Sequence, residues 1–410
     1  MKKKLFDELL ESVREGGAIL RKEREPARTF SFNEQGQAPP ALLAGPIPNP
    51  LLARDRSAAD RERFRRGRCT MAKVSLKGSA MKSWTMLLAG LLLSAAAVAA
   101  DKAAPTIEIR EWQVPWEKTR PRDPAVDRQG RVWFVGQQGD YIGWLDRASG
   151  KFGRFELAPK SGPHNLIVAP SGDIWFSGNT AAYIGRLDPK SGKITKYPMP
   201  DPEAKDPHTL VLAPNGDLWF TVQFGSYVGK LDPKSGAVRL VKVPTQGARP
   251  YGIVIDASGR PWFNEFGTNA LGSIDPKTLK LEEHRLPDPQ ARGRRIALAG
   301  DGGIWYVDYG RGFLARFDPR NGKVEEWQTP GGAGSLPYAM TSDDRGRLWF
   351  VETGPQPNRL VGFDPKNHQF FSTTEIPSGG STVRHMIFEP RTKAIWFGTD
   401  KNTIGRAQVK

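Results

Sequence analysis

Short apolar runs alternate with polar turns along most of this chain, in a pattern that repeats seven times from Arg122 onward. Each repeat holds an apolar run, a turn, a tryptophan followed by a second aromatic residue, and then a sequence motif close to Ile-Gly-x-Leu-Asp-Pro. The tryptophans mark spacings of 42, 44, 43, 43, 44 and 47 residues, and they are Trp133, Trp175, Trp219, Trp262, Trp305, Trp349 and Trp396. Such spacing is typical of propeller blades and too long for ankyrin, tetratricopeptide or leucine-rich repeats.

The unit that spans residues 209–244 predicts how one repeat folds. We expect its strands at residues 209–213, 217–222, 226–232 and 237–243. The turns at residues 214–216 and 233–236 end in glycine, which adopts positive φ at little cost. Glycine and proline at such short intervals exclude helical HEAT-type repeats, which share the period. Four strands per repeat predict an all-β, seven-bladed β-propeller over residues 101–410, with the seven tryptophans in the core between blades.

The two ends of the propeller are predicted to pair with each other. The last repeat ends at residues 404–407 without an outer strand, which leaves an unpaired sheet edge. Residues 111–115, Glu-Trp-Gln-Val-Pro, repeat the outer-strand text Glu-Trp-Gln-Thr-Pro of residues 326–330. We therefore expect residues 106–114 to form the outer strand of the seventh blade and to close the ring.

A secretory signal peptide is predicted at residues 81–100, MKSWTMLLAGLLLSAAAVAA. Lysines precede its apolar run and Ala97-Val98-Ala99 offers a cleavage site, so we expect a periplasmic or secreted protein without a stable membrane span after cleavage. Residues 1–80 contain a Pro-rich stretch and a basic run without apolar periodicity, and we interpret them as a disordered or misassigned extension. Within it, residues 5–30, LFDELLESVREGGAILRKEREPARTF, resemble the N-terminal arm of a helix-turn-helix antitoxin family.

The formal net charge of +16 does not point to nucleic acid as a partner. The first hundred residues hold 18 Lys and Arg against 10 Asp and Glu, which leaves 42 against 34 in residues 101–410. That surplus is spread over every repeat and forms no basic stripe. The only cysteine, Cys69, lies outside the repeats, which excludes disulfides and thiol catalysis in the propeller.

The start of the first strand of each repeat supplies the candidate catalytic residues. Because antiparallel strands alternate in direction, this position and the end of the second strand are expected on the same face of the ring, near its axis. The residues eleven places before each tryptophan include no apolar aliphatic side chain: Arg122, His164, His208, Tyr251, Arg294, Tyr338 and His385. We take His164, His208, Tyr251 and His385 as candidate catalytic residues. A water-filled channel lined with polar side chains is the alternative interpretation.

The end of the second strand supplies candidate metal ligands. Three places after the tryptophans stand Gly136, Gly178, Val222, Glu265, Asp308, Glu352 and Thr399. The carboxylates Glu265, Asp308 and Glu352 in consecutive blades would repel one another without a cation, and oxygen ligands suit Mg²⁺ or Ca²⁺. Neutralisation by Arg294 is an equal alternative.

A histidine beside a carboxylate on this face is a candidate general base near neutral pH. The sequence offers two such pairs, Asp206 with His208 and Glu352 with His385. Both pairs depend on neighbouring blades bringing their side chains together.

The repeat text xPHxIxxxPxGxxWFTxxxxxxIGxLDPxxG is clearest at residues 163–192 and 207–236. It resembles the repeat of the virginiamycin B lyase, or streptogramin lyase, family over nearly all of residues 106–410. The resemblance implies a propeller that linearises a cyclic depsipeptide by elimination across its ester bond, with Mg²⁺ as Lewis acid and a histidine as base.

The resemblance also implies roles for individual residues. It places His164 and His208 in the positions of the family's two histidines, Asp206 in that of a carboxylate and Tyr251 in that of a tyrosine. Val222 stands where the family has a glutamate, although Glu265 follows one blade later. The match requires a cyclic shift of the blades, because the family's histidines are expected in the last two, where this chain has Tyr338 and His385.

Together these observations predict an exported, monomeric, streptogramin-lyase-like propeller. We expect a metal-assisted carbon–oxygen lyase that opens a small-molecule ester or lactone on the central face. One alternative is a non-catalytic propeller that binds a small molecule or a protein there. Another is a metal-dependent lactonase like the gluconolactonase propellers, for which Asn264, Glu265, Asp308 and Glu352 are the available ligands.

Overall fold

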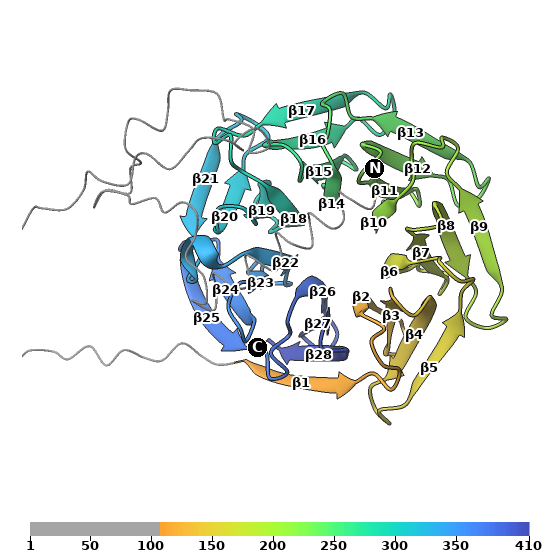
Figure 1. Ribbon diagram of the computed structural model, residues 1–410. Coiled ribbons are helices and arrows are strands. Elements are labelled where there is room, and N and C mark those ends of the chain that lie inside the picture. The colour runs from red at the N-terminus through yellow and green to blue at the C-terminus, as the bar shows by residue number, and fades with distance from the viewer. Residues whose placement is uncertain (1–106, 410) are drawn as a thin grey trace, which may run out of the picture. The chain divides into compact units, whose positions relative to one another are not determined.

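The computed structural model describes residues 107–409, which fold into seven four-stranded antiparallel sheets arranged around one axis (Figure 1). The predicted signal peptide at 81–100, the extension at 1–80 with its antitoxin-like segment, and Cys69 lie outside the described residues. No helix in the described part of the chain is long and apolar enough to cross a membrane. The predicted seven-bladed propeller is confirmed.

Each blade runs from an inner strand at the axis to an outer strand at the rim. Blade one holds β2 (Pro121–Val126), β3 (Arg131–Gly136), β4 (Tyr141–Asp146) and β5 (Phe152–Glu156). Blade two holds β6 (Pro163–Val168), β7 (Ile174–Gly178), β8 (Tyr183–Leu187) and β9 (Ile194–Pro198). Blade three holds β10 (Pro207–Leu212), β11 (Leu218–Val222), β12 (Tyr227–Leu231) and β13 (Val238–Lys242). The strands of blade three match those predicted for residues 209–244 to within two residues.

The remaining blades have the same order. Blade four holds β14 (Pro250–Ile255), β15 (Pro261–Glu265), β16 (Ala270–Ile274) and β17 (Leu281–Arg285). Blade five holds β18 (Gly293–Leu298), β19 (Ile304–Asp308), β20 (Phe313–Phe317) and β21 (Val324–Gln328). Blade six holds β22 (Pro337–Ser342), β23 (Leu348–Glu352), β24 (Arg359–Asp364) and β25 (Gln369–Glu375), after a short 3-10 helix at Gly332–Gly334. Blade seven holds β26 (Val383–Glu389), β27 (Ala394–Thr399), β28 (Thr403–Gln408) and β1 (Glu108–Gln113).

The seven repeated tryptophans lie in the core, as predicted. None is more than 4% exposed. Trp133 of blade one packs against Leu166 and Phe176 of blade two, and Trp175 packs in the same way against blade three. The Trp133 indole also donates a 2.8 Å hydrogen bond to Asp127 in the turn after the inner strand. The tryptophans therefore join neighbouring sheets, and those of blades one, four, five, six and seven also bond to the turn of their own blade.

The ring closes between the two ends of the propeller, as predicted. β1 pairs antiparallel with β28, from Glu108 opposite Gln408 to Gln113 opposite Thr403, and the two strands lie side by side in Figure 1. The Glu111 carboxylate accepts hydrogen bonds from the Ser378 backbone at 2.7 Å and from the Thr403 hydroxyl at 2.6 Å. The edge left by the last repeat is thereby covered.

Every inner strand has an irregular start, which shapes the site. In all seven, the register to the second strand shifts near the first residues, as between Pro207 and Leu210 of β10. Such a bulge breaks the strict alternation of side chains along a strand. Two consecutive residues can therefore both contact groups at the axis.

Candidate functional site

Two rings of side chains line the axis where the inner strands begin, on the face that we call the mouth. The first ring consists of the second residue of each inner strand: Arg122, His164, His208, Tyr251, Arg294, Tyr338 and Arg384. The second ring consists of the third residue of each inner strand: Asp123, Asn165, Thr209, Gly252, Arg295, Ala339 and His385. Six of the seven residues predicted for the first ring are confirmed in it.

The seventh prediction was wrong, because His385 belongs to the second ring. Val383 pairs with Thr399 and Met386 with Phe397, which aligns Arg384 with His208. The cause is the turn of blade seven, where four residues separate the paired Glu389 and Ala394. Only three separate Ala213 from its hydrogen-bond partner Asp217 in blade three. Counting back eleven places from the tryptophan therefore stops one residue short of Arg384.

His164, His208 and Tyr251 form a continuous row across blades two, three and four. The ring centroids of the two histidines lie 3.7 Å apart, and those of His208 and Tyr251 lie 4.2 Å apart. The Tyr251 hydroxyl shares a short hydrogen bond with the Tyr338 hydroxyl from blade six. His164, His208 and Tyr251 are each at most 6% exposed. Three predicted catalytic residues are thus brought together.

Both histidines of the row are held neutral. Burial and then the charges of Arg122, His208, Arg295 and Arg384 lower the pKa of His164 well below its ordinary value. Burial and the arginines likewise lower the pKa of His208. Its Nδ1 lies 2.9 Å from the Thr209 hydroxyl, and Nε2 makes no hydrogen bond to the described residues. In the tautomer whose Nδ1–H donates to Thr209, Nε2 is the atom available to accept a proton.

The row also contains a phenol with a lowered pKa. Burial alone would raise the pKa of Tyr251, but the charges of Arg294, Arg295 and Arg122 outweigh it. For Tyr338, burial and the neighbouring Tyr251 dominate and raise the pKa. The hydrogen-bonded pair is thus asymmetric, with Tyr251 as the more acidic partner.

Asp206 does not pair with His208, in contrast to the prediction. Its carboxylate accepts the backbone N–H of Phe224 at 2.9 Å and 3.1 Å. Burial raises the pKa of Asp206 to about 6. Its observed role is to hold the loop that follows β11.

The second ring forms a bridge across the axis. Arg295 donates to the Thr209 hydroxyl at 2.9 Å, to the backbone carbonyl of Arg384 at 2.9 Å and to Asp123 at 3.3 Å. Asp123 also accepts from Asn165 at 2.8 Å and from Arg122 at 2.9 Å. One buried ion-pair network therefore links the inner strands of blades one, two, three, five and seven.

The predicted acidic arc does not form one cluster. Asp308 is bound by Arg311 at 2.8 Å, and the Glu352 carboxylate accepts Nε of Arg359 at 2.9 Å. Glu265 accepts the Thr268 hydroxyl at 2.7 Å, and burial raises its pKa to about 7. Each carboxylate has a local partner, and Arg294 pairs with none of them.

Comparison with known proteins places the chain in a family. Residues 94–353 match the sequence model of the virginiamycin B lyase family. The chain belongs to this family. No curated protein sequence matches it closely enough to add to that assignment.

Solved structures agree with the assignment to the virginiamycin B lyase family. A streptogramin B lyase is 28% identical, with a TM-score of 0.67, and the match covers 74% of this chain and 98% of that one. Virginiamycin B lyase from Staphylococcus aureus is 25% identical, with a TM-score of 0.68 and 74% and 100% of the two chains covered. A catalytically inactive histidine-to-alanine variant of that enzyme, solved with quinupristin, is 26% identical, with the same TM-score and coverage.

One further neighbour shares the fold alone. Hydrazine synthase of Kuenenia stuttgartiensis is 13% identical, with a TM-score of 0.61, and the match covers 72% of this chain and 97% of that one. The propeller architecture by itself therefore does not specify a reaction.

The described residues of this lyase-family propeller do not fit Mg²⁺ or Ca²⁺ well. They contain no group of three His, Cys, Asp or Glu close enough to hold a metal ion. Glu265 Oε1 and the Asn264 amide are buried and find no hydrogen-bond partner in the described part of the chain. They are neighbours on β15, however, and neighbouring strand residues point to opposite faces. The described residues likewise do not bring together the carboxylates of Glu265, Asp308 and Glu352 that were expected for a gluconolactonase-like site.

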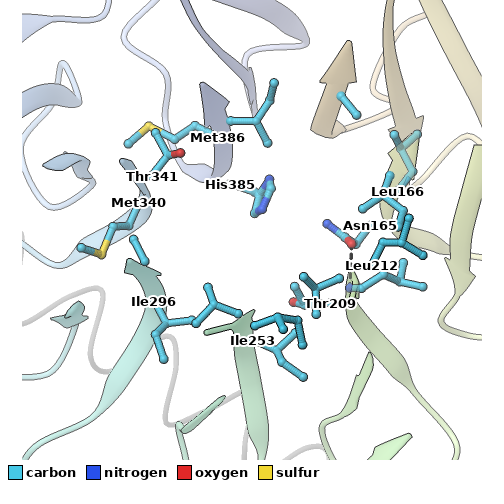
Figure 2. Close-up of a pocket in the computed structure, with 18 of the residues that line it drawn as sticks. Asn165, Leu166, Thr209, Leu212, Ile253, Ile296, Met340, Thr341, His385 and Met386 are labelled. Atoms are coloured by element: carbon cyan, nitrogen blue, oxygen red, sulfur yellow. Dashed lines mark hydrogen bonds between the residues drawn. The ribbon is translucent and has the colours of Figure 1, made fainter. Parts of the chain in front are cut away.

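A separate cavity of about 640 Å³ lies along the axis beyond the second ring. Its polar lining includes Asn165, Thr209 and His385, and Figure 2 shows the His385 ring projecting into it. The rest is mostly apolar and includes Leu166, Leu210, Ile253, Ile296, Met340 and Met386. No first-ring residue lines this cavity, so the second ring separates it from the mouth.

Sequence reasoning missed Asp123, Arg295 and Arg384 as residues of the site. Asp123 and Arg295 directly follow predicted first-ring residues, and Arg384 takes the place predicted for His385. The signal that could have found them is a charged side chain inside an inner strand, at a position where an apolar one is expected. Asp123 also has a φ of 50°, in the left-handed region that a non-glycine residue rarely adopts.

Proposed function

We propose that the mouth is the site of a carbon–oxygen lyase that opens an ester or lactone by elimination. The observation that carries this proposal is the contiguous row of His164, His208 and Tyr251, with a neutral base beside an acidified phenol. Membership of the virginiamycin B lyase family and likeness to a streptogramin B lyase support this class of reaction.

His208 is the general base in this mechanism. Thr209 holds Nδ1, so Nε2 takes the proton from the carbon next to the substrate's carbonyl group. The electron pair of that C–H bond forms a carbon–carbon double bond as the neighbouring carbon–oxygen bond breaks. Tyr251 donates a hydrogen bond to the departing oxygen, and the ester leaves as a carboxylate. No water is added, so a ring opened in this way keeps its composition.

Mass spectrometry after incubation with a cyclic ester tests the proposal. We would incubate the purified full chain with quinupristin, which accompanies the inactive Staphylococcus aureus relative, and with simple lactones. Elimination gives a linear product of unchanged mass and a new double bond, whereas hydrolysis gives a product heavier by one water. The heavier product, or no turnover of any ester, would overturn the proposal.

The variant His208→Ala separates catalysis from folding. Loss of a positioned general base is expected to lower the rate about 10²–10⁴-fold while the melting temperature stays near that of the parent. His368→Ala is the matched control, since His368 contacts Trp327 in a tilted arrangement with ring centroids 4.9 Å apart, away from the row. A large drop in melting temperature in His208→Ala would assign this residue a structural role instead.

A non-catalytic binding propeller is the second candidate. Val222, fully buried, stands where the family resemblance leads us to expect a glutamate. Saturable binding of the ester with no change of its mass over long incubation would favour this candidate.

A further inference from the structure

The mouth carries a surplus of positive charge. Two carboxylates face its guanidinium groups: Asp123 pairs with Arg122 and Arg295, and Asp400 with Arg384 and, at 3.7 Å, with Arg120. The five guanidinium groups of the mouth are those of Arg120, Arg122, Arg294, Arg295 and Arg384. A partly buried site with this imbalance favours an anion.

Arg294 is the one of these five guanidinium groups that pairs with neither carboxylate. Its guanidinium carbon lies 3.7 Å from the ring centroid of Tyr338, 4.2 Å from Tyr309, 4.6 Å from Phe266 and 5.3 Å from Tyr251. No carboxylate of residues 107–409 forms an ion pair with it, and its buried Nε has no hydrogen-bond partner. Aromatic faces stabilise a cation without cancelling its charge. The four rings therefore keep Arg294 in place and leave it able to bind an anion.

The position of Arg294 relative to the row of His164, His208 and Tyr251 determines where a bound anion would lie. Tyr251 contacts both Arg294, whose guanidinium carbon lies 5.3 Å from the centre of its ring, and His208, whose ring centroid lies 4.2 Å away. The charges of the surrounding arginines also reach the histidines, because they contribute to the lowered pKa of both His164 and His208. An anion bound by Arg294 would thus lie beside the group from which His208 takes a proton.

We propose that the substrate carries its own carboxylate, which Arg294 binds, on the carbon that loses its proton. This inference rests on the proposed lyase function and names its substrate class, a carboxylate with an alkoxy or acyloxy group on the β-carbon. Pairing with arginine stabilises the negative charge that develops as the proton leaves. The C–H electron pair becomes the double bond, the β-carbon–oxygen bond breaks, and an alkoxide leaving group takes its proton from Tyr251. The bound carboxylate is unchanged.

Calorimetric titration of the full chain tests this with a matched pair of probes. The pair is a 4-linked uronate disaccharide and its neutral methyl ester, and the His208→Ala variant prevents turnover during the titration. A charge-assisted contact predicts that the uronate binds about 10–100-fold more tightly than the ester, with an affinity that falls as salt rises. In the His208→Ala background, Arg294→Gln should remove the preference for the uronate over its ester, and Arg294→Lys should retain part of that preference.

Arg320→Gln is the matched control, since it removes one arginine paired with Asp318 in the turn after β20, away from the mouth. It should leave both affinities unchanged. Equal binding of acid and ester, failure of both to bind, or a preference that survives Arg294→Gln overturns the inference. Binding with the expected preference but no elimination by the parent chain from the uronate or from any ester would overturn the lyase proposal alone. Elimination from neutral esters without an anion preference would overturn this inference alone.

Discussion

The protonation of His385, at the axis, is controlled by the groups that surround its side chain. Its Nδ1 is buried and has no hydrogen-bond partner among residues 107–409. Burial, opposed by Asp123 but reinforced by Arg295 and Arg122, lowers the pKa of His385 to about 3. The imidazole is therefore neutral in the folded protein under conditions in which the unfolded chain carries a proton there.

This difference predicts a pH dependence of stability. The folded pKa lies below the unfolded value near 6.5, so only the unfolded state gains a proton as the pH falls from 7 to 5, and His385 then destabilises the fold. We expect its contribution to reach about 1–2 kcal/mol over that interval. Urea titrations at several pH values check this, with His385→Gln as the comparison. The variant should lose less stability on acidification, and an identical slope in both proteins would contradict the assignment.

At this scale the sequence identified His164, His208 and Tyr251 but misplaced His385. The first three follow from a constant distance to the tryptophan. That distance changes in blade seven, where the turn has one extra residue. Neither the pairing of Asp308 with Arg311 nor that of Glu352 with Arg359 could be foreseen, because both depend on how the following loops fold back.

Among the strands, β1 has the clearest separate role, since it completes a sheet whose other members come from the opposite end of the propeller. Glu111 ties this strand to blades six and seven through Ser378 and Thr403. Three short hydrogen bonds to one carboxylate mark it as the main polar attachment of β1.

Glu111→Ala is therefore expected to lower stability by about 2 kcal/mol, because charged hydrogen bonds are lost and their partners stay buried in part. Thermal unfolding measures the effect. Glu108→Ala, at an exposed position of the same strand, is the control and should change little. Equal melting temperatures for the two variants would show that backbone pairing alone holds β1.

The strands themselves were predictable from alternation, turn residues and repeated text. The bulges at the starts of the inner strands were not, because the sequence around Pro207 is compatible with a regular strand. These bulges let consecutive residues such as His208 and Thr209 both contribute to the axis. The second ring escaped prediction for this reason.

Across the whole molecule, the Asp123–Arg295 network braces blades that lie far apart in sequence. Both groups are almost fully buried. Burial tends to raise the pKa of Asp123, but the charges of Arg122, His385 and Arg295 outweigh it and lower the pKa. Removing one partner therefore leaves the other as a poorly compensated buried charge.

Arg295→Met is expected to cost about 3–5 kcal/mol of unfolding free energy, while the double variant with Asp123→Asn should cost less than the sum of the two single changes. Denaturant unfolding of all four proteins gives the coupling. Arg316→Met, which breaks an ion pair with Asp301 after the inner strand of the same blade, is the comparison. Additive losses would show that the two groups do not act as one network.

The pairing of β1 with β28 has a consequence for biosynthesis. β1 leaves the ribosome before the other strands of the propeller and must wait for β28 before it finds its partner. Six sheets can assemble in order as the chain grows, but the seventh cannot be completed until β28 has been synthesised. A nascent chain cut short before β28 would keep two unsatisfied edges, at β1 and at β27, by which quality-control proteases could recognise it.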